Sequence, residues 1–338
     1  MTGKVSMLQY PNTPVLQHSN PRMLAMTQET QESALARELK LIAGLKVKRS
    51  EPMARYTSMK IGGPADYFVE VETEQALQRL LALLQRYGIA FYLLGNGSNV
   101  LVSDRGIRGA VVRLAGEFKS VEWREEGPIV RLRVGAAHGV TRLVREAARK
   151  GYGGLEFAEG IPGTVGGALV MNAGAYGSEI EKVIQRVEGI TRQGQATGWT
   201  REEMTFTYRD SHLPEGTVVT RVEMRLGKDE AVRVKSKVDE LVRKRKSSQP
   251  SGFPNSGSMF RNPPGDFAGR LIEAAGLKGK RLGQSQISER HANFIVNLGG
   301  AKADDVRALM ELARFEVKRQ FGIELVPEVR LIGDWSAR

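Results

Sequence analysis

Three short segments of the chain carry side chains suited to proton transfer on an anionic substrate. The segment YRDS contains Arg209, whose guanidinium group can pair with anionic oxygens. The segment GSMFRNP presents Ser258 between a glycine and apolar residues, and the segment VPEVRL contains Glu328. A carboxyl group in an apolar setting can share a proton or hold a charged neighbour. Each of these residue types could hold an anion or share a proton, although YRDS in isolation is more often a surface turn.

A hydrolytic role for Ser258 is disfavoured by its surroundings. A serine nucleophile needs a nearby base and usually lies in a GxSxG turn. Here the sequence is GSMF, and the whole chain contains 4 histidines and no cysteine. No two histidines have the spacing of an HExxH motif. We therefore expect neither a catalytic triad nor a metal site.

A glycine-rich stretch from Gly153 to Gly177 reads GGLEFAEGIPGTVGGALVMNAGAYG. Glycine lets a ligand approach main-chain N–H groups closely, as nucleotide sites require. Pro162 fixes one turn and Asn172 can form hydrogen bonds, which favours a ligand site over a set of tight turns in a β-rich region. The glycines that support this interpretation are Gly160, Gly163, Gly166, Gly167, Gly174 and Gly177.

A second loop follows an apolar strand candidate and has the sequence Gly95-Asn96-Gly97-Ser98-Asn99. Its two glycines expose main-chain N–H groups, and its serine and asparagines add polar side chains suitable for a pyrophosphate. The alternative is a simple hairpin turn. The chain lacks a GxGxxG turn between a first strand and its helix, so the phosphate-binding loops are not those of a Rossmann unit.

Length and composition limit the class of protein. A chain of 338 residues is expected to form two or three packed units. No apolar run approaches the roughly 20 residues needed to cross a bilayer, so membrane insertion is not expected. The absence of cysteine fits a reducing compartment, and the beginning MTGKVSMLQYPNT does not have the pattern of a secretory signal. We therefore expect a cytoplasmic protein.

The formal net charge of +12 favours anionic partners, which include nucleic acids, membrane surfaces and phosphorylated small molecules. The densest basic segment, Arg233 to Lys246, has valines and a leucine at near-helical intervals. We interpret it as a helix with a solvated basic face rather than a nucleic-acid arm. Aromatic residues make up 7% of the chain and do not follow the basic run, which argues against a nucleic-acid groove.

The order of elements predicts an α+β fold rather than a regular βαβ alternation. Residues 1–35 are expected to be a disordered, mobile extension, followed by a first domain at 36–229 and a second at 230–338. The boundary lies near Gly227 to Glu230. Hydrophobic periodicity predicts helices at 36–48, 73–87, 140–150, 233–246, 267–275 and 304–321, and strands at 91–95, 110–114, 129–134, 291–298 and 328–332, with a β-rich stretch at 183–226.

Taken together, the motifs closely resemble those of one family, the UDP-N-acetylenolpyruvoylglucosamine reductases of peptidoglycan precursor synthesis. The resemblance covers about Tyr56 to Ile332. It runs through YTSMKIGGPAD, LLGNGSNVLVSDRGIRG, the glycine-rich block, YRDS, SGSMFRNPPGDFAGRLIEAAGLKG, SERHANFIVN and VPEVRLIG. So many motifs in one order are far more specific than any single one of them.

The resemblance implies a flavoenzyme. Its FAD-binding portion would have the two-subdomain α+β fold of the vanillyl-alcohol oxidase type, followed by a smaller substrate-binding domain. The implied reaction reduces the enolpyruvyl ether of UDP-N-acetylglucosamine to the lactyl ether of UDP-N-acetylmuramate, with NADPH as electron source. In this reading Ser258 protonates the α-carbon, while Arg209 and Glu328 hold the carboxylate and stabilise the developing charge.

The resemblance also assigns binding residues. Those expected to touch FAD are Tyr56, Gly95, Asn96, Gly97, Ser98, Asn99, Ile161, Pro162, Gly163, Gly166, Gly167, Asn172, Gly174, Ala175 and Gly177. Those expected at the nucleotide end of the substrate are Tyr208, Asn262 and Arg330.

Two features refine the comparison with the family. Arg261 stands where many relatives have lysine, which keeps the charge but changes the geometry of any contact. Some members carry an extra loop with a substrate-capping tyrosine. Ser258 follows Arg209 by 49 positions, which leaves no room for that loop and indicates the shorter form. A monomer is expected, without nucleic acid as a partner. The alternatives are another FAD-dependent oxidoreductase of this fold and a basic nucleic-acid-binding protein.

Overall fold

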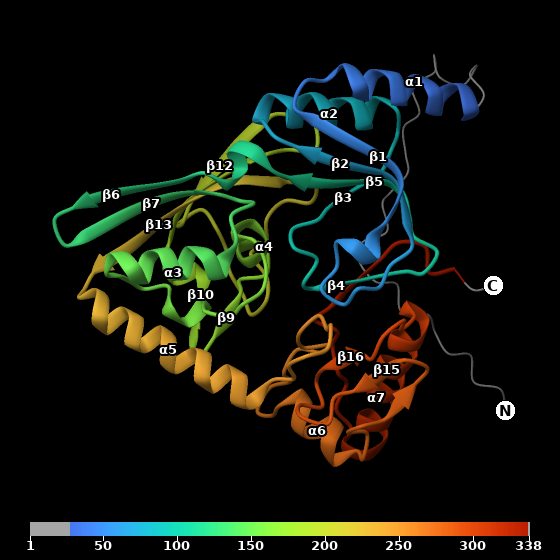
Figure 1. Cartoon of the computed structure of the whole chain (residues 1–338), viewed down its shortest axis with the longest axis vertical. Coiled ribbons are helices and arrows are strands. Elements are labelled where there is room, and N and C mark those ends of the chain that lie inside the picture. Colours follow the sequence, from blue (N-terminus) through green and yellow to red (C-terminus); the bar gives the residue numbers. More distant parts are fainter. Residues whose placement is uncertain (1–27, 337–338) are drawn as a thin grey trace.

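The computed structural model describes residues 28–336 of the chain, and Figure 1 shows the arrangement of its three parts. Most of the predicted mobile extension, residues 1–27, lies outside the described residues. The remainder of that stretch forms the start of helix α1 (Gln28–Leu41).

The first part is a four-stranded sheet in the order β1-β2-β5-β3. Strands β2 and β1 are antiparallel, whereas β5 runs parallel to both β2 and β3. Helices α1 and α2 cover one face of this sheet (Figure 1). The bounds are β1 (Leu45–Pro52), β2 (Pro64–Val71), α2 (Glu74–Arg86), β3 (Phe91–Leu93) and β5 (Ile107–Leu114), with the short 3-10 helix η2 (Met53–Arg55) after β1.

Helix α2 shows why this layer forms. Its apolar residues recur at helical spacing, so that Leu77, Leu80, Leu81 and Leu84 are all buried against the sheet. The Thr73 side chain accepts a hydrogen bond from the Ala76 N–H and caps the helix start. The predicted helix at 73–87 is confirmed.

The predicted helix at 36–48 is wrong in its second half. The helix ends at Leu41, and residues from Leu45 onward form strand β1 instead. Gly44 adopts a φ of +84° in the turn between them, and Leu45 and Val47 then pack against the core from the strand. Pairing with β2 along the whole strand outweighs the local helical pattern.

The second part is an antiparallel sheet in the order β12-β11-β13-β7-β6, with the short β8 also paired to β13. Helices α3 and α5 lie on one side of it (Figure 1). The strands are β6 (Val121–Glu126), β7 (Ile129–Gly135), β8 (Tyr152–Gly153), β11 (Ile184–Ile190), β12 (Ala196–Thr200) and β13 (Val218–Lys228). The helices are α3 (Val140–Lys150), α4 (Val165–Val170) and α5 (Ala231–Ser248), with 3-10 helices η3 (Gly116–Lys119), η4 (Glu156–Ala158) and η5 (Ile180–Lys182).

The glycine-rich block crosses this second part. It contains η4, α4 and a small hairpin made of β9 (Gly174–Ala175) and β10 (Ser178–Glu179). One hydrophobic core joins the two sheets, because buried residues of α2, β2, β7, α3 and β13 belong to the same cluster. The two FAD-binding subdomains expected from the sequence are therefore packed around a shared core.

The third part has a core of its own, which includes Met259, Phe260 and Val317. Its three-stranded sheet has the order β14-β15-β16. The elements are α6 (Ala268–Ala274), β14 (Arg281–Leu282), β15 (Ser285–Ile287), β16 (Ile295–Asn297) and α7 (Ala303–Phe321). The predicted helices in this region are confirmed, whereas the predicted strand at 291–298 is shorter than expected.

The end of the chain returns to the first part. Strand β17 (Arg330–Ile332) runs parallel to β4 (Val100–Val102), directly after the loop Gly95 to Asn99. Helix α5 starts just after the predicted boundary at 229/230, yet it contacts α3 and η4 of the second part. The chain thus passes between the FAD-binding portion and the third part twice, once along α5 and once at β17. These two connections place the third part beside the loop Gly95 to Asn99.

Within residues 28–336, no helix is both long and apolar enough to cross a membrane. The same residues contain no group of three or more His, Cys, Asp or Glu side chains placed to hold a metal ion.

Candidate active site

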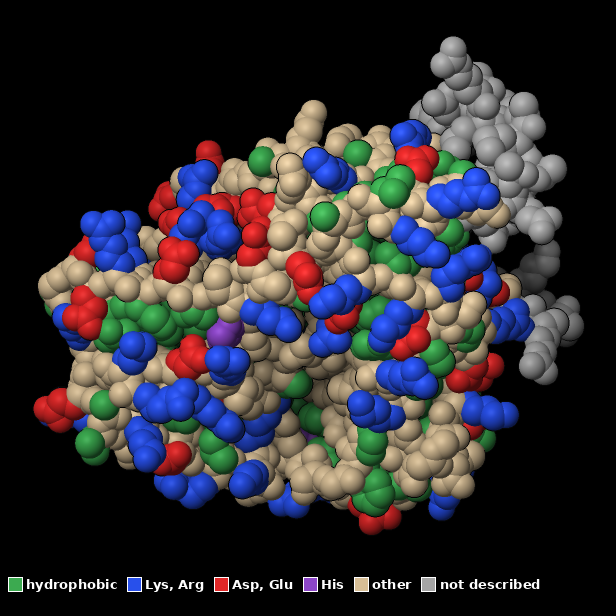
Figure 2. All heavy atoms as spheres, turned by 45° about the horizontal axis from the view of Figure 1, so that its top comes forward, with side chains coloured by type: hydrophobic (Ala, Val, Ile, Leu, Met, Phe, Trp, Pro, Cys, Tyr) green, Lys and Arg blue, Asp and Glu red, His purple; other side chains and the backbone are tan. Residues whose placement is uncertain are grey.

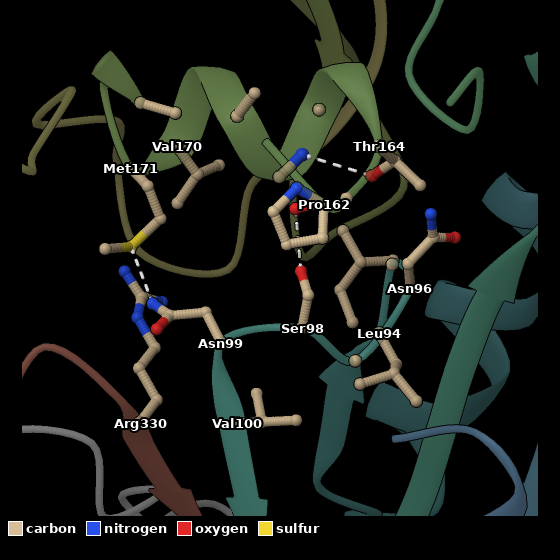
Figure 3. Close-up of a pocket in the computed structure, with 18 of the residues that line it drawn as sticks. Leu94, Asn96, Ser98, Asn99, Val100, Pro162, Thr164, Val170, Met171 and Arg330 are labelled. Carbon is tan, nitrogen blue, oxygen red and sulfur yellow. Dashed lines mark hydrogen bonds between the residues drawn. The ribbon is translucent and has the colours of Figure 1, made fainter. Parts of the chain in front are cut away.

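A cavity of about 710 Å³ lies where the three parts of the molecule meet. It is lined by the loop after β3, by the segment around α4, by the chain near Ser258 and by β17. Figure 3 shows the loop after β3 and Arg330 of β17 facing the segment around α4. The predicted site residues that line it are Gly95, Asn96, Gly97, Ser98, Asn99, Ile161, Pro162, Gly163, Gly166, Gly167, Gly174, Ala175, Arg209, Ser258, Glu328 and Arg330.

The loop from Gly95 to Asn99 is held tightly from behind. Gly97 has a φ of +62°, and a Cβ atom there would lie 2.1 Å from the Tyr56 carbonyl oxygen. The Gly97 carbonyl accepts a hydrogen bond of 2.9 Å from the Ser58 N–H. A side chain at this position would therefore push the loop into the cavity.

Side-chain hydrogen bonds join this loop to the glycine-rich wall (Figure 3). The Ser98 hydroxyl donates to the Pro162 carbonyl at 2.9 Å. The Thr164 hydroxyl oxygen accepts from the Gly167 N–H at 3.3 Å and caps α4. A Cβ atom on Gly166 would lie 2.9 Å from that of Ala136, so the helix packs directly on the chain just after β7. These contacts form a wall of backbone with few side chains.

Opposite this wall, Arg209 and Glu328 form an ion pair. The Arg209 Nε–H donates to Glu328 Oε1 at 3.1 Å, and one Nη of Arg209 donates to the Gly174 carbonyl at 3.3 Å. Both side chains are largely buried, with 18% and 16% of their surface exposed. Arg209 has a φ of +64°, an uncommon backbone conformation for a residue other than glycine. Such strain persists where the surrounding structure requires it, often at functional sites.

Burial raises the pKa of the Glu328 carboxyl, while the charges of Arg209 and Arg261 and the Arg209 hydrogen bond act in the opposite direction. The neutral acid therefore persists to higher pH than it would for a free glutamate. A carboxyl group in this state can donate a hydrogen bond as well as accept one.

Asn99 connects the two walls. Its Nδ2 donates to the Glu328 carbonyl at 3.1 Å, and its own carbonyl accepts from the Arg330 N–H at 3.0 Å. Nδ2 also contacts the Met171 sulfur at 3.5 Å (Figure 3). The loop that follows β3 therefore fixes the position of Glu328 relative to the glycine-rich wall.

Ser258 lines the same cavity from the third part of the molecule. The described residues offer its hydroxyl no hydrogen-bond partner, so the group is available to a ligand. Its backbone neighbour Met259 accepts a hydrogen bond from the Glu328 N–H at 2.8 Å. Ser258 and Glu328 are thus held side by side on adjacent stretches of chain that lie 70 positions apart in the sequence.

Five predicted residues lie outside the cavity wall. The Tyr56 ring stacks on Phe68 with centroids 4.1 Å apart, and its hydroxyl donates to Glu51 at 2.8 Å. Tyr56 therefore supports the Gly97 turn from behind. The Asn172 side chain is buried and donates to Glu179 at 2.9 Å, bracing the β9–β10 hairpin.

The other three also do not line the cavity. Gly177 forms the turn of the β9–β10 hairpin with a φ of +79°. The Tyr208 ring lies 4.7 Å from the Arg209 guanidinium and is 43% exposed. The Asn262 side chain accepts a hydrogen bond from the Ala268 N–H at 3.1 Å, at the start of α6.

The structure adds Arg245, which the sequence placed on a solvated helix face. Its stem passes so close to Gly160 that a Cβ atom there would lie 2.6 Å from Arg245 Cδ, and its head group lines the cavity. Burial lowers its pKa, against the raising influence of Tyr176 and Glu159. The described residues offer its guanidinium no hydrogen-bond or ion-pair partner. Helical periodicity alone could not distinguish this arginine from its exposed neighbours.

The cavity wall is rich in positive charge. Burial also lowers the pKa of Arg330, while Asp210 raises it. Figure 2 shows Lys and Arg side chains gathered on one face of the molecule, including around a hollow near its centre. The cationic residues of the wall are Arg113, Lys119, Arg192, Arg209, Arg245 and Arg330, against the carboxylates Glu215 and Glu328. Such a site favours ligands that carry several negative charges.

Two family models match the chain. Residues 65–197 match an FAD binding domain. Residues 249–332 match the C-terminal domain of UDP-N-acetylenolpyruvoylglucosamine reductase. The first match contains both glycine-rich loops, and the second contains Ser258 and Glu328.

Relatives that match most of the chain carry the same family description. UDP-N-acetylenolpyruvoylglucosamine reductase 2 of Symbiobacterium thermophilum is 47% identical over 290 residues, which cover 85% of this chain and 92% of the relative. The reductase of Myxococcus xanthus is 44% identical over 90% of this chain and 98% of its own length. The chain belongs to the UDP-N-acetylenolpyruvoylglucosamine reductase family. The family predicted from the sequence is therefore confirmed.

The fold agrees with that of a solved family member. The crystal structure of UDP-N-acetylenolpyruvylglucosamine reductase (MurB) from Thermus caldophilus matches with a TM-score of 0.75 at 40% identity. The match covers 85% of this chain and 99% of the other. The α+β FAD-binding fold with a smaller C-terminal domain, predicted from the sequence, is confirmed, and the protein is an FAD-dependent oxidoreductase.

Proposed function

We propose that this protein reduces the enolpyruvyl ether of UDP-N-acetylglucosamine to the lactyl ether, giving UDP-N-acetylmuramate, with NADPH as the electron source. One observation carries the proposal. The Arg209–Glu328 pair and Ser258 line a single cavity together with the side-chain-poor wall formed by the loop Gly95 to Asn99 and the segment Ile161 to Gly167.

The residues present suit FAD. The wall of backbone has places where a Cβ atom would collide, as at Gly97, and it offers main-chain N–H groups to a diphosphate and a flat surface to an aromatic ring. Residues of the two loops, from Gly95 to Asn99 and from Ile161 to Gly167, would hold the cofactor. When bound, FAD supplies the hydride that is added to the β-carbon of the enolpyruvyl group.

Arg209 and Glu328 act on the substrate carboxylate. Addition of hydride at the β-carbon leaves electron density next to the carboxylate, in the form of an enolate. The Arg209 guanidinium pairs with that charge, and the protonated form of Glu328 donates a hydrogen bond to it. Their mutual contact at 3.1 Å prepares both groups before the substrate enters.

Ser258 completes the reduction by giving its hydroxyl proton to the α-carbon. Its freedom from other partners among the described residues leaves the hydroxyl able to turn toward that atom. Solvent then restores the proton to the serine oxygen. A positioned proton donor of this kind contributes typically 10²- to 10⁴-fold to the rate of the step.

The surplus arginines bind the phosphates of the nucleotides. Arg330 and Arg245 line the cavity, and each would donate a charge-assisted hydrogen bond to a phosphate oxygen. Tyr208 and Asn262 do not line the cavity, and we propose that they meet the more distant part of the sugar nucleotide. We further propose that the protein works as a cytoplasmic monomer. Light scattering of the purified protein gives its mass in solution and so tests whether it is a monomer.

An anaerobic spectral titration tests the function. We expect purified protein to be yellow, to be bleached by about one equivalent of NADPH, and to regain its colour when the enolpyruvyl sugar nucleotide is added. The product should be 2 Da heavier than the substrate. Recovery of colour with oxygen alone, with peroxide formed, would instead indicate an oxidase of the same fold.

A filter-binding assay with RNA addresses the basic surface. The proposal predicts weak binding that salt abolishes, because charge without stacking aromatic residues gives only non-specific attraction. A tight complex at physiological salt would favour the nucleic-acid alternative.

A further inference from the structure

The chain around Ser258 lies between two other stretches of the third part. On one side, the Met259 N–H donates to the Asn293 carbonyl at 2.8 Å. On the other side, the Met259 carbonyl accepts from the Glu328 N–H at 2.8 Å. The next turn of this chain is anchored in the same way, because the Arg261 N–H donates to the Val326 carbonyl at 2.9 Å. Ser258 is therefore placed by its neighbours and not by its own side chain.

Asn293 adds a side-chain clamp to this arrangement. Its Oδ1 accepts from the Phe260 N–H at 2.9 Å, and its Nδ2 donates to the Phe260 carbonyl at 2.8 Å. The amide thus satisfies both polar backbone groups of a residue two positions after Ser258. Phe260 and Asn293 are only 1% and 3% exposed, so water cannot readily replace either bond.

We propose that Asn293 is a positioning residue for the proton transfer from Ser258. By holding the Phe260 backbone from both ends, the Asn293 amide sets where the Ser258 hydroxyl points into the cavity relative to Glu328. This inference rests on the proposed function, since it assumes that Ser258 protonates the substrate. Asn293 itself does not line the cavity and acts through the backbone.

The contacts of Asn293 allow its positioning role to be distinguished from a role in FAD binding. Its contacts hold the backbone of Met259 and Phe260, and they involve none of the predicted FAD-binding residues. A small shift of Ser258 would therefore leave cofactor binding and its reduction by NADPH intact. It would slow the step that needs the hydroxyl at the α-carbon, since a misplacement near 1 Å can cost about 100-fold.

The substitution Asn293→Asp tests the clamp with the least change of shape. It keeps the acceptor for the Phe260 N–H and replaces the donor to the Phe260 carbonyl with an oxygen. The matched control is Asn297→Asp. Asn297 is equally buried at 3% exposed, accepts from the Gly299 and Ala301 N–H groups and donates to the Met59 carbonyl, so the same change is made on the Met59 backbone rather than on that of Phe260.

Stopped-flow spectroscopy then follows the two half-reactions separately. For Asn293→Asp at pH 8 we expect bleaching by NADPH within about twofold of the unmodified protein, and recovery of colour on adding the enolpyruvyl sugar slowed by about 100-fold. The slow step should show a larger solvent deuterium isotope effect. At lower pH the introduced carboxyl gains a proton and can donate again, so the rate relative to unmodified protein should rise. For Asn297→Asp both half-reactions should change by the same factor.

The inference is overturned if Asn293→Asp slows both half-reactions equally, or if Asn297→Asp gives the same selective loss. A crystal structure of Asn293→Asp provides a readout independent of activity, and an unmoved Ser258 hydroxyl would also overturn it. If Asn293→Asp does not fold, Asn293→Ser, which retains a smaller donor, is measured in the same way. Failure of the proposed function would look different, because the unmodified protein itself would then not recover its colour with the sugar nucleotide.

Discussion

The two walls of the cavity are built on different principles. One wall is made of backbone, and its loops from Gly95 to Asn99 and from Ile161 to Gly167 are each a continuous piece of sequence. The opposite wall is made of side chains from three distant places, namely Arg209, Ser258 and Glu328. In the proposed function, the backbone wall seats the flat cofactor, whereas the side-chain wall stabilises charge and transfers the proton. Damage to the two walls should therefore have separable consequences.

Strain is also distributed unequally between the walls. Among the described residues other than glycine with positive φ, Arg209 alone lines the cavity, and it does so on the side-chain wall. On the backbone wall, glycine takes the left-handed positions, as at Gly97. The backbone wall therefore depends on the absence of side chains, whereas the side-chain wall holds Arg209 in an uncommon backbone conformation.

Loss of the backbone wall should have the largest effect. In Gly97→Ala the new Cβ would meet the Tyr56 carbonyl at 2.1 Å, so the loop must move. We expect the purified protein to retain little or no FAD, measured as absorbance near 450 nm per protein, and so to lose activity. The control is Gly127→Ala, which has nearly the same φ of +60° but open space around its Cβ. Full FAD content in Gly97→Ala would show that the loop does not cradle the cofactor.

Loss of Arg245, which we propose binds nucleotide phosphates, should have an intermediate effect on ligand binding. Arg245→Gln removes a charged donor, and a charge-assisted hydrogen bond contributes about 1.5 to 3 kcal/mol. We expect the dissociation constants for NADPH and for the sugar nucleotide to rise by about tenfold or more. FAD content should not change. Arg243→Gln, two positions earlier on the exposed face of α5, should leave both constants unchanged.

If Arg245→Gln lowers FAD content while leaving both dissociation constants intact, Arg245 belongs to the cofactor wall. Isothermal titration of the oxidised protein with each nucleotide, with FAD content measured on the same samples, distinguishes the two outcomes.

The smallest effect is expected from the pH dependence of stability. Burial raises the Glu328 pKa in the folded state, so the folded protein binds this proton more tightly than the unfolded chain. The stability that Glu328 contributes is complete below its unfolded pKa and is lost as the pH rises through the raised, folded value. Glu328→Gln removes this titration. The melting temperature of the variant should therefore improve relative to the unmodified protein as pH rises over that range. An unchanging difference would show that the folded-state pKa is not raised.

The backbone wall could be predicted from the sequence because it is local. The glycines and the polar loop residues stand next to one another in the chain, so their order alone indicated both loops that line the cavity. The amphipathic helix α2 was predictable for the same reason, since four leucines at helical spacing define its buried face. The family resemblance then supplied the expectation that both loops face FAD.

The motifs indicated which residues form the side-chain wall, but they did not predict which of those residues contact one another. The bond between Arg209 and Glu328 joins positions 119 apart, and no local pattern predicts it. Arg245 could not be distinguished from the other basic residues of its helix. The Asn293 side chain contacts Phe260 only in the folded chain, because the two residues are far apart in the sequence. Tyr56 shows the converse, because a residue within a matching motif stands behind the wall rather than on it. Helix α1 and strand β1 were misplaced where pairing across the sheet overrode a local helical pattern.

The comparison of the two walls is tested most directly by Ser258→Ala, measured anaerobically in both half-reactions. The account predicts that NADPH bleaches the variant at a rate within about twofold of the unmodified protein, because the backbone wall is intact. It predicts that recovery of colour with the enolpyruvyl sugar nucleotide slows by about 10²- to 10⁴-fold, because the proton donor is gone. An equal loss in both steps, or an unchanged second step, would contradict the assignment of proton transfer to the side-chain wall.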